Sequence, residues 1–441
     1  MTASQDQKSE SELKSESGWT SGVSLGRLGA AAFVLGLVLG LGGIVRDCAL
    51  TCHVGYRHAP IAFLVVAALS LPIMALQLRM QRRWGAETWR VRSTVFVVAV
   101  LFAFRLLLLA LHSDSGSVGK LARVLYVAFF VWVDVAFMLI GAQLFALVQG
   151  DERATDRGLT VFSAAVYAGG LIGGLVAAGA NSWLTERLHL PFDIARDHLM
   201  LAMAIVLLLL LPIARSKSPA PAAPVPDEAA AAEDHGGMKM ALRVLAGEQE
   251  SRVVTAAFIF ASASGICLES LFYWILTLQS AGGGGFVRLL ATLSIWMNGA
   301  SLVLAAGGAS RIIRHVGLAA AVLAVPACLL LGSGYLLVAT GLLVMLAMRV
   351  LKDSLSGGLY EPASERLLVR LQGERYSKQR PIFEVASRLG TGLGALLVLL
   401  LTLGLNASVH ALIVLVVALH VLWLVVLVPL ARRSRQAAAS S

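Results

Sequence analysis

Apolar runs long enough to cross a membrane recur along the whole chain, and they constrain its fold more than any other feature. A helix needs about 20 apolar residues to span the hydrocarbon core of a bilayer. We place twelve such runs at 28–45, 59–78, 93–112, 121–148, 158–180, 197–214, 252–279, 287–308, 316–332, 334–352, 382–403 and 409–430. Residues 207–211 and 396–401 show none of the alternation of a membrane β-strand. The sequence therefore predicts an all-α integral membrane protein with twelve transmembrane helices.

Composition excludes the soluble classes that a length of 441 residues would otherwise allow. Charged residues make up 14% of the chain, against about 25% in an ordinary globular protein. Four cysteines are too few for a disulfide scaffold, and the apolar content is too high for a disordered chain. The sequence carries no nucleophile, ATPase or standard zinc pattern, so we expect no enzyme activity, no cofactor and no metal site.

The distribution of lysine and arginine sets the expected topology. With the N-terminus in the cytoplasm, cytoplasmic segments hold 27 of these residues and outer segments hold 7. This asymmetry follows the positive-inside rule. The net charge of +10 therefore reflects topology rather than nucleic-acid binding. We expect a monomer in the inner membrane, with the lipid bilayer as its main partner and both termini in the cytoplasm.

A polar segment at 215–250 divides the spans into two groups of six. Its proline- and alanine-rich part is typical of a flexible connector. We therefore expect a disordered cytoplasmic tail at 1–27, a six-helix bundle at 28–214, a cytoplasmic linker at 215–250, a second six-helix bundle at 251–430 and a cytoplasmic tail at 431–441. This layout resembles the major facilitator superfamily, in which two bundles rock about a site at the membrane midplane.

Glycines are concentrated in the fifth and eleventh spans, which occupy equivalent positions in the two halves. They are Gly169, Gly170, Gly173, Gly174 and Gly179, and Gly390, Gly392 and Gly394. Both spans contain G-x-x-x-G, which lets helix backbones approach closely. The glycines serve either tight packing alone or sliding between helices during a gating cycle.

Ionisable side chains inside spans are the main candidates for function, because each costs about 2.5–3.5 kcal/mol on insertion scales. Arg105 lies in the third span and Asp134 in the fourth. Their depths differ by roughly 9 Å at 1.5 Å per residue, which a long arginine side chain can cover. We expect either a structural ion pair or a pair linked to substrate or to protons.

Glu269 is the only carboxylate of the seventh span, which is a cavity and gate helix in the major facilitator layout. A carboxyl group without a cationic partner in a low-dielectric cavity favours its neutral form. We therefore take Glu269 as a candidate for proton coupling, with a structural hydrogen bond as the alternative. Other candidates for lining a cavity are Asn298 and the aromatic residues Tyr126, Trp132, Tyr273, Trp274 and Trp296; anchoring and packing are the alternatives for the aromatics.

Two further groups of charges lie in the second half. Arg349, Lys352 and Asp353 end the tenth span, and Arg349 and Asp353 share a helix face because they are four residues apart. They predict a gate ion pair or side chains that reach the membrane surface. Arg388 follows Glu384 by one helical turn at the start of the eleventh span. Arg388 is a candidate for binding an anionic substrate or for pairing with Glu384.

Short motifs also carry a resemblance to a known family. The first set is Val124-Leu-Tyr-Val, Asp134, Gln143-Leu-Phe-Ala, Asp151-Glu-Arg-Ala and the glycines of the fifth span. The second set is Arg349-Val-Leu-Lys-Asp-Ser-Leu, Tyr360-Glu-Pro, Arg375-Tyr-Ser-Lys and Arg388-Leu-Gly, with Arg46-Asp47 as a further match. In order and spacing they resemble the ATP:ADP antiporter (nucleotide transporter) family. The resemblance implies a transporter with a nucleotide or nucleotide-like substrate.

The departures from that family bear on the substrate. Ser377 and Gln379 stand where the family usually has lysines, and Phe383 and Thr391 stand where it usually has acids. A di- or triphosphate needs concentrated cationic donors. We expect a secondary active transporter that moves a small polar or anionic organic solute by alternating access, with a coupling proton. The alternatives are a non-transporting membrane scaffold or partner subunit, and a drug/proton antiporter that binds apolar cations.

Overall fold

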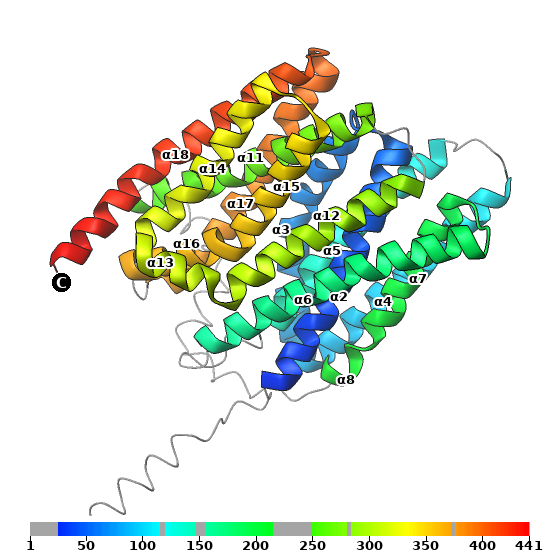
Figure 1. The fold of residues 1–441 in the computed structure, drawn as a ribbon. Coiled ribbons are helices and arrows are strands. Elements are labelled where there is room, and N and C mark those ends of the chain that lie inside the picture. The colour runs from blue at the N-terminus through cyan, green and yellow to red at the C-terminus, as the bar shows by residue number, and fades with distance from the viewer. Residues whose placement is uncertain are drawn as a thin grey trace, which may run out of the picture.

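The computed structural model describes residues 25–114, 120–146, 155–214, 249–279, 284–372 and 375–440, and within these ranges the chain is built from helices and short connections. Residues 1–24 of the predicted N-terminal tail and almost all of the predicted linker lie outside the described residues, and α2 begins within the predicted tail at Leu25. The start of α2, the short helix α8, helix α13 and the C-terminal end of α18 lie at one end of the molecule (Figure 1). The cytoplasmic placement of this end stays a prediction.

Most elements of each half are long helices. The first half contains α2 (Leu25–Ala49) with a π-helical turn at Leu50–Val54, α3 (Ala59–Trp84), α4 (Ala86–Asp114), α5 (Lys120–Ala146), α6 (Thr155–Ser182) with a π-helical turn at Trp183–Arg187, α7 (Phe192–Leu208) and α8 (Leu211–Ala214). The second half contains α11 (Gln249–Gln279), α12 (Gly284–Val303) with a π-helical turn at Leu304–Gly308, α13 (Ala309–Val316), α14 (Leu318–Val338), α15 (Leu342–Leu355) with a π-helical turn at Ser356–Tyr360, α16 (Glu361–Gln372), α17 (Arg375–Leu399) with a π-helical turn at Leu400–Gly404, and α18 (Val409–Ser440).

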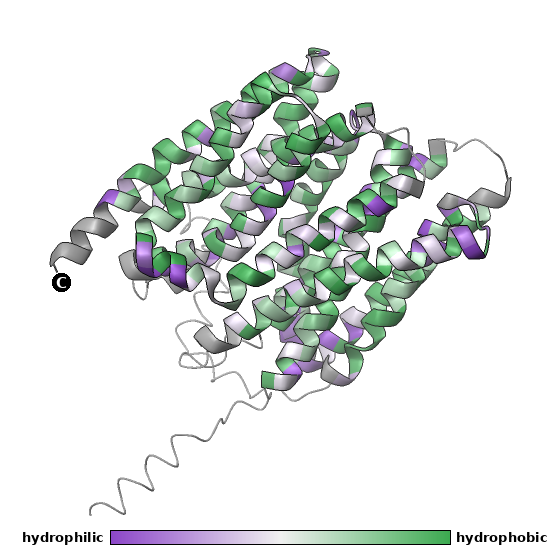
Figure 2. Ribbon diagram, viewed as in Figure 1, coloured by the Kyte–Doolittle hydropathy of each residue, from purple (hydrophilic) through white to green (hydrophobic). Residues whose placement is uncertain are grey.

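Ten of the described helices are long and apolar enough to cross a membrane. The shorter helices α7 and α15 occupy the positions of the sixth and tenth predicted spans, so the structure is compatible with twelve. The helices are mainly hydrophobic along their length, and hydrophilic residues gather on α13 at one end (Figure 2). The predicted all-α membrane architecture is confirmed.

The boundary between the ninth and tenth predicted spans is wrong. We placed it at Gly332-Ser333-Gly334, but α14 continues through these residues to Val338, and α15 begins at Leu342. A Cβ at Gly332 would overlap the sulfur of Met348 on α15. Gly332 therefore serves the close packing of α14 on α15 and does not end a helix.

One helix pair in each half packs closely through glycine. In the first half α2 lies along α6, and in the second half α11 lies along α17. A Cβ at Gly169 of α6 or Gly390 of α17 would overlap a backbone carbonyl of the facing helix. At these two positions the tight-packing interpretation of the glycine motif is correct.

The two halves meet mainly along two helix pairs, α6 with α12 and α3 with α17, with smaller contacts of α2 with α12 and of α3 with α11. Gly170 and Gly174 of α6 face α12, and Gly392 of α17 lies 3.5 Å, measured from its ideal Cβ position, from Ala67 of α3. Small residues therefore line both contacts between the halves. Sliding at these contacts stays a hypothesis.

Candidate functional site

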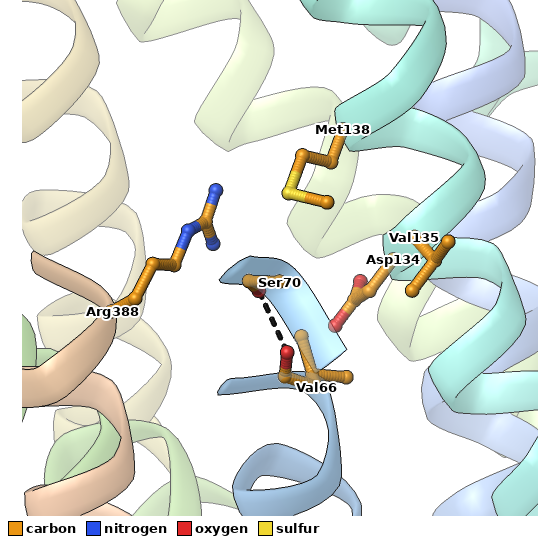
Figure 3. A pocket seen from close by; sticks show the side chains of 6 residues that line it. All are labelled: Val66, Ser70, Asp134, Val135, Met138 and Arg388. Carbon is orange, nitrogen blue, oxygen red and sulfur yellow. Dashed lines mark hydrogen bonds between the residues drawn. The ribbon is translucent and has the colours of Figure 1, made fainter. Parts of the chain in front are cut away.

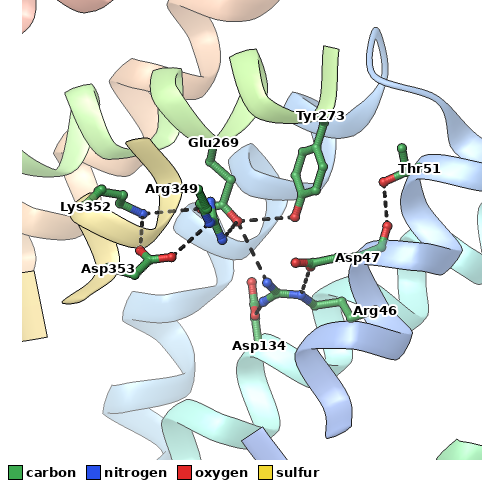
Figure 4. A network of polar contacts seen from close by, with 9 residues as sticks. All are labelled: Arg46, Asp47, Thr51, Asp134, Glu269, Tyr273, Arg349, Lys352 and Asp353. Carbon is green, nitrogen blue, oxygen red and sulfur yellow. Dashed lines mark hydrogen bonds and ion pairs between the residues drawn. The ribbon is translucent and has the colours of Figure 1, made fainter. Parts of the chain in front are cut away.

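A network of charged side chains joins the two halves where α2, α5, α11 and α15 converge (Figure 4). We call it the interface network, and its members are Arg46 and Asp47 on α2, Asp134 on α5, Glu269 and Tyr273 on α11, and Arg349, Lys352 and Asp353 on α15. The exposed fractions of its charged side chains are between 8% and 22%. Charges at this depth are expensive unless they are paired.

Arg46 organises the part of the network in the first half. Its Nε donates to Asp47 Oδ1 at 2.8 Å, and its Nη1 donates to the carboxylate of Asp134. The guanidinium also lies over the ring of Phe130, 4.5 Å from its centre. One positive charge is therefore shared between two carboxylates.

Glu269 organises the part in the second half. It accepts a hydrogen bond from Arg349 Nη2 at 3.1 Å and one from the Tyr273 hydroxyl at 3.3 Å. Asp353 forms ion pairs of 2.9 Å with both Arg349 and Lys352, and Lys352 Nζ lies 3.9 Å from Glu269 Oε2. Two cations and two carboxylates balance here.

Among the described residues, one charge contact connects the two parts of the network. Arg46 Nη2 lies 3.9 Å from Glu269 Oε1, so an arginine of the first half faces a carboxylate of the second. Nearby, the rings of Tyr56 and Trp274 stack across the same boundary with centres 4.8 Å apart. The halves are in contact at this level through groups that can separate without breaking a helix.

A partly open pocket of about 250 Å³ lies next to the network and is lined by both halves. Its walls come from α3, α5 and α17 and consist of Val66, Ser70, Asp134, Val135, Met138 and Arg388. The side chains of Asp134 and Arg388 extend into it from opposite walls (Figure 3). Arg388 has no ion pair or hydrogen bond with any residue that the structure describes.

A second group of buried charges belongs to the first half alone. We call it the N-half cluster, and it consists of His53, Tyr126, Asp193, Arg196 and Asp197. Arg196 is 0% exposed. Its guanidinium lies 2.8 Å from Asp197, 2.9 Å from the Tyr126 oxygen, 3.1 Å from Asp193 and 2.7 Å from His53 Nε2. Asp197 is 1% exposed, so the pair of Arg196 and Asp197 excludes water more fully than the interface network, whereas Asp193 at the edge of the cluster is 37% exposed.

Several predicted site residues come together in the structure, and others do not. Asp134, Glu269, Tyr273, Arg349, Lys352 and Asp353 share the interface network, and the expected pairing of Arg349 with Asp353 is present. The proposed pair of Arg105 with Asp134 is not formed. Asp134 binds Arg46 instead, and Arg105 Nη2 lies 3.4 Å from His198 Nδ1. The view of Glu269 as a carboxylate without a cationic partner is wrong, because Arg349 donates to it.

The remaining predicted residues lie away from the pocket. Trp296 is 67% exposed on α12, so it faces outward and does not line a cavity. Trp132 packs edge-on against Phe96, and Tyr126 belongs to the N-half cluster.

Two predicted polar residues of the second half also differ from expectation. Asn298 donates to the backbone carbonyl of Ser294 one turn earlier, and it contacts Gly170 where α12 meets α6. Glu384 is exposed on α17 and forms no ion pair with Arg388 within the described part of the chain.

The sequence analysis did not identify two arginines of these clusters as site residues. We assigned Arg46 and Arg196 to outer segments because each lies next to the end of a predicted span. In the structure α2 continues to Ala49 and α7 begins at Phe192, so both arginines lie inside helices. The Arg46-Asp47 motif was the available signal for the first. Within the described residues no group of three metal-ligating side chains could hold a metal ion.

Comparison with known proteins supports the fold alone. No protein-family model matches the chain, and no curated protein matches its sequence. Among solved structures, it is similar to a bacterial homologue of the iron transporter ferroportin in an inward-facing state, with 13% identity over 93% of this chain and 100% of that chain and a TM-score of 0.62. It is also similar to the xylose transporter XylE from E. coli in a partially occluded inward-open conformation, with 13% identity over 91% and 96% of the two chains and a TM-score of 0.63. A third similar structure is the E. coli fucose:proton symporter FucP, with 16% identity over 93% and 98% and a TM-score of 0.56.

These similarities identify the fold as that of the major facilitator transporters, as the two groups of six spans predicted. The three similar structures are those of transporters, and at 13–16% identity the likeness shows the fold alone. The resemblance to the ATP:ADP antiporter family finds no support in these comparisons.

Proposed function

We propose that the chain is a secondary active transporter that carries a small polar or anionic organic solute by alternating access. The interface network carries this proposal, because the contact of Arg46 with Glu269 crosses between the halves beside a pocket lined by both. Alternating access requires contacts between the halves that break and re-form around a fixed site. An ion pair in a partly wet site is suited to that task. Glycines at the boundary between α6 and α12 fit the same motion.

Proton coupling is the second element of the proposal. Asp134 and Glu269 each hold an arginine, and protonation of either carboxyl removes the charge that holds it. A proton would therefore free a cation of the network and weaken the contact between the halves. The fucose:proton symporter of the same fold is an example of such coupling in another protein.

The charge balance of the site does not favour a nucleotide. Arg46, Arg349 and Lys352 are matched by carboxylates, which leaves Arg388 as the one pocket cation without an anionic partner among the described residues. A di- or triphosphate needs several free cationic donors. We therefore do not expect nucleotide uptake.

Uptake into liposomes tests the proposal. The purified chain is reconstituted and offered labelled monocarboxylates, amino acids, sugars, nucleotides and apolar cations, with and without an inward proton gradient. We expect uptake of a small solute that the gradient stimulates, and Glu269→Gln should abolish the stimulation while the protein still folds. The matched control is Glu384→Gln, which removes an exposed carboxylate from α17.

Other outcomes select the alternatives. Unchanged pH dependence in Glu269→Gln contradicts the coupling role. Uptake of nucleotides or of apolar cations would replace the proposed substrate class. A chain that transports nothing and co-purifies with one stable membrane partner would be a scaffold.

A further inference from the structure

We infer that the pocket between the halves takes a zwitterion, a small molecule with one carboxylate, one ammonium group and a short apolar body. This inference rests on the proposed transport function and names its substrate class. It follows from the charges on the two walls, from the chemistry of the surfaces between them and from the size of the pocket.

The wall formed by the first half carries one excess negative charge. Arg46 is its only cation in the interface network, and it is shared between Asp47 and Asp134. Among the described residues Asp134 forms an ion pair with Arg46 alone, and its side chain is 21% exposed and lines the pocket. A carboxylate that shares one arginine with a second carboxylate retains capacity to accept from a further donor. An ammonium group is such a donor.

The opposite wall carries one excess positive charge. Arg388 lies on α17, and no residue in the described ranges pairs with it, while its guanidinium extends into the pocket (Figure 3). A guanidinium presents a planar fork of donors that matches a carboxylate. The carboxylate of the solute is therefore expected on this side.

The rest of the network is neutral and does not alter this balance. Glu269 and Asp353 are matched by Arg349 and Lys352. With Arg388 included, the site holds four positive and four negative side chains. A solute without net charge keeps this balance, whereas a monoanion or a cation leaves one wall unmatched in a medium where unmatched charge is costly.

The surfaces between the two charges are mainly apolar and small. Val66, Val135 and Met138 line the pocket, and the Ser70 hydroxyl already donates to the carbonyl of Val66 at 2.6 Å. A volume of about 250 Å³ suits a molecule of amino-acid or betaine size and is below the usual range of about 300–1,000 Å³ for drug-sized ligands.

The two binding groups also belong to different halves of the molecule. Asp134 is on α5 of the first half and Arg388 is on α17 of the second. A solute that pairs with both would draw the walls together, which couples binding to closure. A singly charged analogue contacts one wall only and lacks this effect.

The test is a thermal-shift titration of the full-length chain in detergent with matched probes. Each set contains a zwitterion, its analogue without the amine and its analogue without the carboxylate, such as L-leucine, 4-methylpentanoate and 3-methylbutylamine. Glycine betaine, γ-aminobutyrate and the other protein amino acids extend the panel. We expect a zwitterion to raise the melting temperature, with both of its analogues about tenfold to a hundredfold weaker, because each loses one charge-assisted contact.

Two substitutions assign the contacts. Asp134→Asn should remove the preference for the zwitterion over the monoanion, and Arg388→Gln should weaken both. Arg388→Lys should restore part of the affinity, and Glu384→Gln, an exposed position outside the pocket lining, should leave it unchanged.

The outcomes separate this inference from the function that it rests on. If monoanions bind as tightly as zwitterions and depend on Arg388, the pocket is a transport site and the zwitterion inference is overturned. If only solutes without a carboxylate bind, or if Asp134→Asn leaves the preference intact, the inference is also overturned. A panel without any response overturns it as well and counts against the transporter proposal.

Discussion

The interface network and the N-half cluster use the same chemistry in two different settings. Both place arginines between carboxylates inside the helical region, and in each an aromatic ring lies over a guanidinium. The N-half cluster is built within one half, and its Arg196 is 0% exposed. The interface network is contributed by both halves and is partly wet. If the halves move as rigid bodies, the first cluster keeps its contacts and the second must rearrange.

We propose that the charges of the N-half cluster hold their bundle together and that those of the interface network change partners during function. Removing a partner from a dry ion pair leaves a buried uncompensated charge, which costs about 3–5 kcal/mol. Removing a partner from a partly hydrated network costs less free energy, because water can reach the remaining charged group. Substitutions in the two clusters should therefore differ in how much stability they remove.

Arg196→Met should cause the largest loss of stability. It leaves Asp197, which is 1% exposed, without its cation. We expect the free energy of unfolding to fall by about 3–5 kcal/mol, seen as a much lower melting temperature in detergent or as loss of the monodisperse protein. Arg57→Gln, at an exposed position, is the control. If Arg196→Met kept the wild-type melting temperature, the cluster would have no structural role.

Arg349→Gln should mainly affect transport. The substitution removes the ion pairs to Glu269 and Asp353, and we expect uptake to fall by at least about tenfold. The melting temperature should fall less than in Arg196→Met, because the side chains involved are 8–22% exposed. Arg252→Gln, an exposed position on α11, is the control. Normal uptake with a collapsed melting temperature would reverse the assignment.

Substitutions of Arg46 and Glu269 should be non-additive in their effect on the free-energy difference between the conformations of the protein, because the two side chains contact each other across the halves. A double-mutant cycle with Arg46→Gln and Glu269→Gln should give an interaction energy of about 0.5–3 kcal/mol. The matched cycle of Glu269→Gln with Tyr126→Phe should be additive, because the two residues share no hydrogen-bond or ion-pair partner among the described residues. Equal coupling in both cycles would mean that the two networks act as one.

The two tyrosine hydroxyls should give the smallest effects, in a fixed order. Tyr126→Phe removes a bond of 2.9 Å to Arg196, which is worth about 1–3 kcal/mol for a buried charged partner. Tyr273→Phe removes a longer bond of 3.3 Å to Glu269 in the wetter network. Chemical denaturation should rank Tyr126→Phe as the more destabilising. The opposite order would contradict the distinction between the networks.

The helices were predictable because membrane spans carry a strong local signal. Their ends were not, because polar residues at helix ends resemble loops in the sequence. Arg46 and Arg196 illustrate this limit. Each lay next to a predicted boundary and was assigned to the outside, whereas burial by neighbouring helices keeps both in helical structure. Gly332 illustrates the reverse error. We took this glycine as the end of a helix, whereas it lies inside α14 and allows close packing against Met348.

The members of the site were easier to predict than their partners. We singled out Asp134, Glu269 and Arg388 because a charge inside a membrane span is costly and therefore indicates a function. Which charge meets which depends on helix rotation and on contacts between the halves, and neither has a local signal. Asp134 therefore pairs with Arg46 and not with Arg105. Trp296 shows the same limit, because an outward face and a cavity face are equally apolar.

Two distances between the halves, measured with spin labels, show whether the interface network holds one conformation of the protein. Spin labels at Leu78 on α3 and Val316 on α13 report on one end of the molecule, and labels at Arg57 and Leu278 report on the end where Tyr56 meets Trp274. All four positions are exposed, and the native cysteines are replaced in the background. If the interface network holds one conformation, Glu269→Gln should lengthen the distance from Arg57 to Leu278 and shorten that from Leu78 to Val316. Identical distance distributions in the wild type and in Glu269→Gln would contradict the account.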